Sequence, residues 1–192
     1  MNKENAKLKE LLTLTPDDEK NALIKAIDFA ELRLDDESYL GEDRINYNLA
    51  IALSIAKSKD SVFNANAIKT AILIGTNSII DSELFANFGN RVAMNVISLS
   101  EKESLLPIVQ MGRIVECGNE AILVKKHSIL QSLELLKKSP FDIRSNQINE
   151  FQSVIPLWKA FDKGFAFEIN NAIESVPLFT VHHSDNLEVN MS

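Results

Sequence analysis

Residues 66–99 read NAIKTAILIGTNSIIDSELFANFGNRVAMNVISL, and this stretch decides the fold. Its first part, Ala67 to Ile74, is apolar on every side apart from one lysine and one threonine, which is typical of a central helix that is buried all round. We expect this helix to end at Gly75 and a second helix to begin near Ser82. A break at Phe88-Gly89 is followed by apolar residues at helical spacing, namely Val92, Val96 and Leu99. The stretch therefore predicts a helical core interrupted by two glycines.

Helical signals continue on both sides of this core. Thr15-Pro16-Asp17-Asp18 predicts a helix start, with Thr15 as the N-cap and Pro16 at the first helical position. Apolar periodicity places the other helices at residues 16–34, 45–58, 107–117 and 120–138. The sequence thus predicts an all-α fold in a single domain of residues 1–192, with its core at about 16–138.

An aromatic-rich helical region is expected at about 147–175. Pro156 should kink this region or start its second helix. Its aromatic stripes are expected to pack over the core, and an exposed partner-binding face is the alternative. Residues 176–192 are expected to form a loosely ordered tail, with an extended segment at 176–181.

Composition limits the class of protein. The 192 residues are 45% hydrophobic, which suffices for one domain with a real core. No apolar run is long enough to span a bilayer, and the N-terminal residues MNKENAKLKE lack the apolar stretch of a signal peptide. The single cysteine, Cys117, excludes an internal disulfide, and the net charge of −7 argues against nucleic acid and anionic membranes as partners. We expect a cytoplasmic protein.

The order of the helical segments resembles the HD-type pyrophosphohydrolase domain of the RelA/SpoT family, the alarmone hydrolases. In that family a helix reading roughly AALLHDTVEDT is followed by a phenylalanine–glycine pair and a VA-x-LV run. Residues 67–99 show similar segments in the same order. Residues 41–48, GEDRINYN, resemble the family's GEPYI-x-HP, and residues 121–132, AILVKKHSILQS, resemble AILVKLADRLHN. The resemblance implies an HD-domain-like helical bundle.

The resemblance also implies which residues occupy the family's functional positions. The family's metal ligands fall on Tyr47, Gly75, Thr76 and Ser128, and its acidic pair falls on Ile79 and Ile80. The family's substrate-contacting asparagine falls on Ser132, and Lys125 matches a lysine of the family. A Mn²⁺ site needs imidazole and carboxylate ligands, which these residues do not supply. The metal-binding motif is therefore expected to be lost, leaving no catalytic residue, no metal site and no cofactor.

Nucleotide binding without hydrolysis is a second hypothesis. The family's basic pair, which meets the nucleotide, falls on Ser38 and Tyr39, and three acidic residues at 35–37 precede them. These carboxylates would repel a polyphosphate. Lys125 ends an apolar run, where a lysine usually lies at the surface with its stem packed on apolar neighbours. Among the other reactive side chains, we expect His127 to be half-buried in packing and Cys117 to be an inert buried thiol.

The sequence favours a catalytically inactive pseudoenzyme that acts as a protein-interaction or regulatory module. Its partner is an unknown protein, and a homo-oligomer stays open. The alternatives are an alarmone sensor without hydrolysis and a phosphohydrolase with altered chemistry. We further expect Tyr47 to pack inward against the turn at 75–80, with its hydroxyl near Thr76 or Ser128. Gly75 is expected to leave room for the Tyr47 ring.

Overall fold

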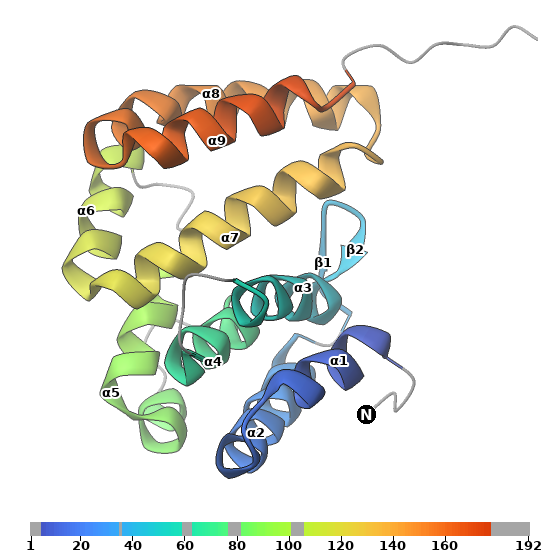
Figure 1. The fold of residues 1–192 in the computed structure, drawn as a ribbon, viewed down its shortest axis with the longest axis vertical. Coiled ribbons are helices and arrows are strands. Elements are labelled where there is room, and N and C mark those ends of the chain that lie inside the picture. The colour runs from blue at the N-terminus through green and yellow to red at the C-terminus, as the bar shows by residue number, and fades with distance from the viewer. Residues whose placement is uncertain (1–4, 35, 59–62, 77–81, 101–105, 178–192) are drawn as a thin grey trace, which may run out of the picture.

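The computed structural model describes residues 5–34, 36–58, 63–76, 82–100 and 106–177, and these form helices almost throughout (Figure 1). The only strands in the described residues are β1 (Ser38–Tyr39) and β2 (Glu42–Asp43), which pair antiparallel as a short hairpin. The helices are α1 (Ala6–Leu14), α2 (Asp17–Arg33), α3 (Arg44–Ala56), α4 (Ala65–Leu73), α5 (Ser82–Leu99), α6 (Pro107–Cys117), α7 (Asn119–Leu136), α8 (Phe141–Phe161) and α9 (Lys163–Glu174). The predicted all-α class is confirmed. Among these helices, none has the length and apolar character needed to cross a lipid bilayer.

Helix α4 is the centre of the first hydrophobic cluster. It packs against α2, α3, α5 and α7, and its residues Ala67, Ile68, Ala71, Ile72 and Leu73 are fully buried. Asn48 of α3 fixes the end of α4, because its side-chain amide donates to the Ile72 and Ile74 carbonyls at 2.9 and 2.8 Å. These carbonyls have no partner within their own helix, so the buried amide satisfies them. The prediction of a central buried helix is confirmed.

Helix α5 contains the expected break. Gly89 has φ 75° and ψ 167°, a conformation that side chains with a Cβ rarely adopt, and the helix axis kinks there. The preceding Phe88 packs edge to face on Phe29 of α2, with ring centroids 5.1 Å apart. Helix α5 packs on α4, α6 and α7, and the Phe88 ring adds a contact with α2.

A buried carboxylate joins three helices. Glu120, in the first turn of α7, accepts from Arg91 Nε at 2.7 Å and from Asn95 Nδ2 at 3.2 Å, both on α5. Asn66 of α4 approaches it at 3.5 Å. Because a buried charge is tolerated only when it is paired and hydrogen-bonded, this cluster fixes α4, α5 and α7 relative to one another.

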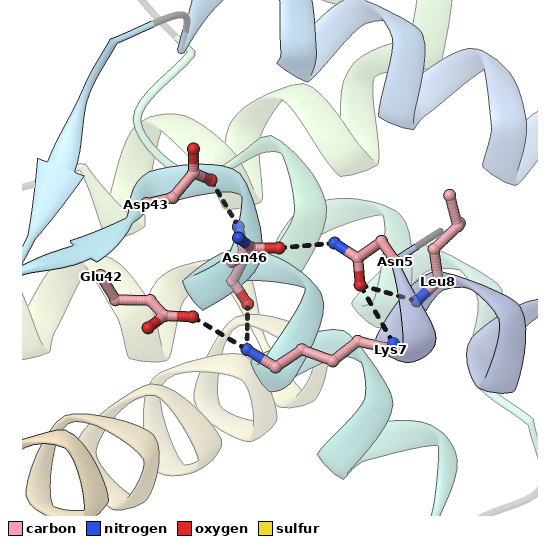
Figure 2. Close-up of polar contacts among 6 residues, drawn as sticks. All are labelled: Asn5, Lys7, Leu8, Glu42, Asp43 and Asn46. Carbon is pink, nitrogen blue, oxygen red and sulfur yellow. Dashed lines mark hydrogen bonds and ion pairs between the residues drawn. The ribbon is translucent and has the colours of Figure 1, made fainter. Parts of the chain in front are cut away.

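Helix α1 is an element that the sequence analysis did not predict. Asn5 caps it by accepting from the Lys7 and Leu8 amides, and Leu8 and Leu11 are buried in the first cluster. Figure 2 shows how α1 is attached to β2 and α3: Asn5 donates to Asn46 Oδ1, and Lys7 Nζ reaches Glu42 Oε1 at 3.1 Å and the Asn46 carbonyl at 3.2 Å.

The role expected for Thr15 is wrong. Its hydroxyl donates back to the Leu11 carbonyl at 2.7 Å, so it closes the end of α1 and does not cap α2. Helix α2 begins at Asp17, after Pro16, without a side-chain cap. Threonine can satisfy a carbonyl four residues earlier as readily as it can cap a following helix, and the unpredicted α1 decides between the two.

Helices α8 and α9 lie side by side on one face of α7, and α3 and α4 lie on the other (Figure 1). A second hydrophobic cluster fills the space between α7, α8 and α9, and it contains Ile129, Leu133, Leu136, Ile148, Trp158, Phe165 and Ile169. The Trp158 and Phe165 rings meet edge to face at 4.6 Å. The packing role expected for the aromatic stripes is confirmed for these residues, whereas Phe161 and Phe167 are exposed.

The break between the last two helices lies at Asp162 and not at Pro156. Helix α8 begins at Phe141, earlier than the expected 147, and continues past Pro156 to Phe161. Asp162 then caps α9 by accepting from the Phe165 amide at 3.0 Å, and its other oxygen meets Lys126 Nζ of α7 at 2.5 Å. The predicted tail beyond residue 177, including most of the extended segment, lies outside the described residues.

Candidate functional site

Three of the residues that the resemblance singles out, Tyr47, Ser128 and Ser132, come together between α3 and α7. Tyr47 is 3% exposed, and its hydroxyl lies 2.9 Å from Ser128 Oγ and 2.8 Å from Ser132 Oγ. The expectation that Tyr47 packs inward with its hydroxyl near Ser128 is therefore confirmed. The two serines lie one helical turn apart on α7, which places both hydroxyls on the side that faces α3.

Tyr39 of β1 completes this hydroxyl cluster, which consists of Tyr39, Tyr47, Ser128 and Ser132. The Tyr39 hydroxyl lies 3.2 Å from Ser132 Oγ, and its ring lies 4.5 Å from the Tyr47 ring. Ser132 Oγ donates to the Ser128 carbonyl at 2.9 Å, and the Tyr47 hydroxyl lies 3.1 Å from the same carbonyl, to which it can also donate. In each contact between two hydroxyls of the cluster, either oxygen can be the donor.

Gly75 and Arg44 form the other part of the site. Gly75 has φ +87°, and a Cβ built on it would lie 3.3 Å from Arg44 Nη2 and 3.4 Å from Arg44 Nε. The room beside Gly75 is thus occupied by Arg44, and not by the Tyr47 ring as expected. The guanidinium stacks over both rings, 5.0 Å from the Tyr39 centroid and 5.6 Å from that of Tyr47, within cation–π range.

Thr76 is buried but does not join the hydroxyl cluster. Its Oγ1 donates to the Leu73 carbonyl at 2.8 Å, and its own carbonyl accepts from Arg33 Nη1 at 3.2 Å. The side chain therefore closes the end of α4. Ile79 and Ile80, which take the positions of the family's acidic pair, lie outside the described residues, and so does the remainder of the turn against which Tyr47 was expected to pack.

A small cavity of about 110 Å³ opens beside the hydroxyl cluster. Its walls are Tyr39, Lys125, Ser128, Ile129 and Ser132, together with Gln147, Glu150 and Phe151 of α8. The sequence analysis placed Lys125, Ser128 and Ser132 in the site but had no signal for the three residues of α8. These enter because α8 folds back on α7, which no local pattern specifies.

The residues present do not fit the Mn²⁺ site that the resemblance implies. Within the described ranges, no group of three or more His, Cys, Asp or Glu side chains is placed to hold a metal ion. Neutral hydroxyls occupy the position instead, and the Arg44 guanidinium stacks on the two tyrosine rings. The four hydroxyl side chains of the cluster supply neither a carboxylate nor an imidazole ligand, and a cation beside them would meet the positive charge of Arg44.

His127 lies near the site in sequence but makes a separate contact. It is half-buried, as expected, and its Nδ1 lies 2.8 Å from the Ser54 hydroxyl of α3. Burial lowers the pKa of His127, and the neighbouring Lys126 charge lowers it further. A neutral imidazole can either accept the Ser54 proton at Nδ1 or donate from it, depending on which ring nitrogen carries the hydrogen. Cys117 is half-buried, and its Sγ lies 3.7 Å from the Met94 carbonyl.

Comparison with known proteins adds no family assignment. No protein-family model matches the chain, and a search of curated proteins finds no significant match. The resemblance to the HD-type hydrolases consequently rests on the quoted sequence segments alone.

Proposed function

We propose that this protein is a catalytically inactive relative of the HD-type alarmone hydrolases that works by binding and not by hydrolysis. The observation that carries the proposal is the pair formed by Gly75 and Arg44. Gly75 takes the position of a family metal ligand, yet its backbone is left-handed, and a Cβ there would press on the Arg44 guanidinium at 3.3 Å.

The backbone conformation at position 75 disfavours any side chain that could bind a metal ion. A non-glycine residue in such a conformation costs on the order of 1–3 kcal/mol. A histidine at position 75 would also have to displace the guanidinium from the Tyr39 and Tyr47 rings. Several substitutions would thus be needed to rebuild a metal site.

The alternative role as a nucleotide sensor has less support. Sites for drug-sized ligands usually have volumes of roughly 300–1,000 Å³, whereas the cavity at the hydroxyl cluster has about 110 Å³. Asp36 and Glu37 are exposed beside the hairpin that carries Tyr39. Their charges repel a polyphosphate approaching from that side.

A binding role is supported by large apolar side chains at the surface. Those more than two-fifths exposed are Leu14, Leu32, Met94, Leu106, Ile108, Val109, Phe141, Phe161 and Phe167. Several of them gather on or beside one helix, α6. Exposed apolar surface of this kind is common where a protein contacts a partner.

The test combines activity, affinity and metal content. Purified protein is incubated with guanosine tetraphosphate and Mn²⁺, and pyrophosphate release is measured against a sample without protein. We expect no release, no calorimetric binding at low micromolar nucleotide, and no stoichiometric manganese, iron or zinc by elemental analysis. Release that disappears in a Ser128→Ala variant would establish hydrolysis and overturn the proposal. Tight binding without release would establish the sensor instead.

A further inference from the structure

The cavity beside the hydroxyl cluster has polar groups on each of the elements that enclose it, namely the β1–β2 hairpin, α7 and α8. The hydroxyl cluster lines one side, and Lys125 of α7 adds an ammonium group. From α8 come the amide of Gln147 and the carboxylate of Glu150. Among the described lining residues, Ile129 and Phe151 are the purely apolar ones. A cavity with polar groups on all sides takes water or a polar ligand, whereas an apolar cavity stays dry.

Two of the described lining residues carry a charge, and they belong to different helices. Lys125 lies on α7 and Glu150 lies on α8, so the cavity has one positive and one negative wall. A simple anion would be attracted by Lys125 but repelled by Glu150, and a simple cation would meet the reverse. The pair of charges therefore favours a molecule that carries both signs over a molecule that carries only one.

The size and depth of the cavity limit the ligand further. Its volume of about 110 Å³ equals that of roughly four water molecules at the density of the liquid. Ser132 is only 2% exposed and lies at the closed end, whereas Glu150 is exposed and lies at the mouth. A ligand that fills this space has a few non-hydrogen atoms, of which a short apolar part can contact Ile129 and Phe151.

We propose that the cavity binds a small zwitterionic amino acid, of the size of glycine or alanine. Its carboxylate lies toward Lys125 and the hydroxyl cluster, which supply hydrogen-bond donors, and its ammonium group lies toward the Glu150 carboxylate. Gln147 Nε2 donates to Glu150 Oε2 at 3.1 Å, which restricts the carboxylate before a ligand arrives. The inference goes beyond the proposed function, because it holds whether or not the chain hydrolyses guanosine tetraphosphate.

The experiment titrates the isotope-labelled full chain with glycine and with L-alanine, from about 10 µM to 10 mM, the range expected for a ligand of so few atoms. Amide chemical shifts of residues 125–132 and 147–151 should change and reach saturation. Acetate carries only the negative charge, methylammonium only the positive charge, and glycerol neither. Each should bind at least about tenfold more weakly than glycine, because each lacks at least one of the two charged contacts.

Glu150→Gln removes the negative charge and keeps the shape of the side chain. It should weaken glycine binding at least about tenfold and leave acetate binding unchanged or tighter, since the repulsion of the anion is gone. A purely structural effect of the substitution would not change the preference between the two probes. Lys125→Gln should weaken glycine and acetate alike. Glu168→Gln is the matched control, because Glu168 is exposed on α9 and does not line the cavity, and it should keep the affinity for glycine.

Three outcomes would overturn the inference. The first is the absence of saturable shifts with glycine and alanine over the whole range. The second is acetate binding as tightly as glycine, which would identify a plain anion site. The third is an unchanged affinity for glycine in Glu150→Gln. All three leave the pyrophosphate-release assay of the proposed function unaffected.

Discussion

The Tyr47 hydroxyl lies 2.8 Å from Ser132 Oγ, and this buried contact joins α3 to α7. It belongs to the hydrogen-bond network of the hydroxyl cluster. It fixes the two helices without any charge of its own, and Arg44 covers it from the side of Gly75.

Removal of the Tyr47 side chain should test this structural role. Tyr47→Ala should destabilise the fold by roughly 3–5 kcal/mol, as expected for truncation of a buried aromatic residue. Tyr47→Phe keeps the ring but removes the hydroxyl that contacts Ser128 and Ser132, and should cost about 1–3 kcal/mol. Urea unfolding followed by circular dichroism gives both values. Equal stability of Tyr47→Phe and the wild type would show that the hydroxyl contacts contribute nothing.

Gly75→Ala should destabilise the protein by roughly 1–3 kcal/mol, because alanine is strained at φ +87°. A further part of the loss should come from contact of the new Cβ with Arg44. Unfolding of the single variants and of the Gly75→Ala, Arg44→Ala double variant separates the two causes. If the double variant loses as much as the two singles added together, Arg44 does not restrict position 75.

Glu120 should be more sensitive to substitution than its partner Arg91. Glu120→Ala removes the buried acceptor shared by Arg91 and Asn95 and should cost roughly 2–4 kcal/mol. Arg91 is 70% exposed, so Arg91→Ala should cost about 1 kcal/mol or less. Thermal or urea unfolding ranks the two variants. A larger loss of stability in Arg91→Ala than in Glu120→Ala would contradict this prediction, because it would show that the exposed arginine contributes more than the buried carboxylate.

Acidification should weaken the fold in two separate ranges. The folded protein lowers the pKa of His127 from 6.5, so the unfolded chain binds more protons and stability falls as the pH drops below about 6.5. The hydrogen bond from Lys126 lowers the pKa of Asp162 from 3.8, so its contribution is present above about 3.8 and is lost at lower pH. His127→Gln should remove the first slope only. Asp162→Asn should reduce the second, to which Asp17 also contributes because its hydrogen bond with Lys20 lowers the pKa of that carboxyl group as well. Unfolding free energies measured from pH 3 to 8 check both. An unchanged slope near pH 6 in His127→Gln would assign that range to other groups.

Local patterns predicted the elements better than their contacts. The buried α4 and the break at Gly89 were readable because apolar periodicity and a glycine act within one stretch of chain. Helix α1 was missed, and Thr15 was misassigned because its hydroxyl can serve the helix before it or the helix after it. In the site, the resemblance to the HD-type hydrolases placed Tyr47 near Ser128. The approach of Arg44 to Gly75 depends on how α3 meets the end of α4, and the α8 wall of the cavity depends on how two long helices pair. Neither leaves a local signal.

Helix α7 contributes to both hydrophobic clusters, and its Ile122 packs against each of them. Unfolding α8 and α9 alone would expose Ile129, Leu133 and Leu136 of α7 to water. Unfolding the first cluster alone would remove α3 and α4 from the other face of α7. The two halves of the molecule should consequently melt in one cooperative transition. The amide protons of α7 should then exchange with solvent only when the whole chain unfolds.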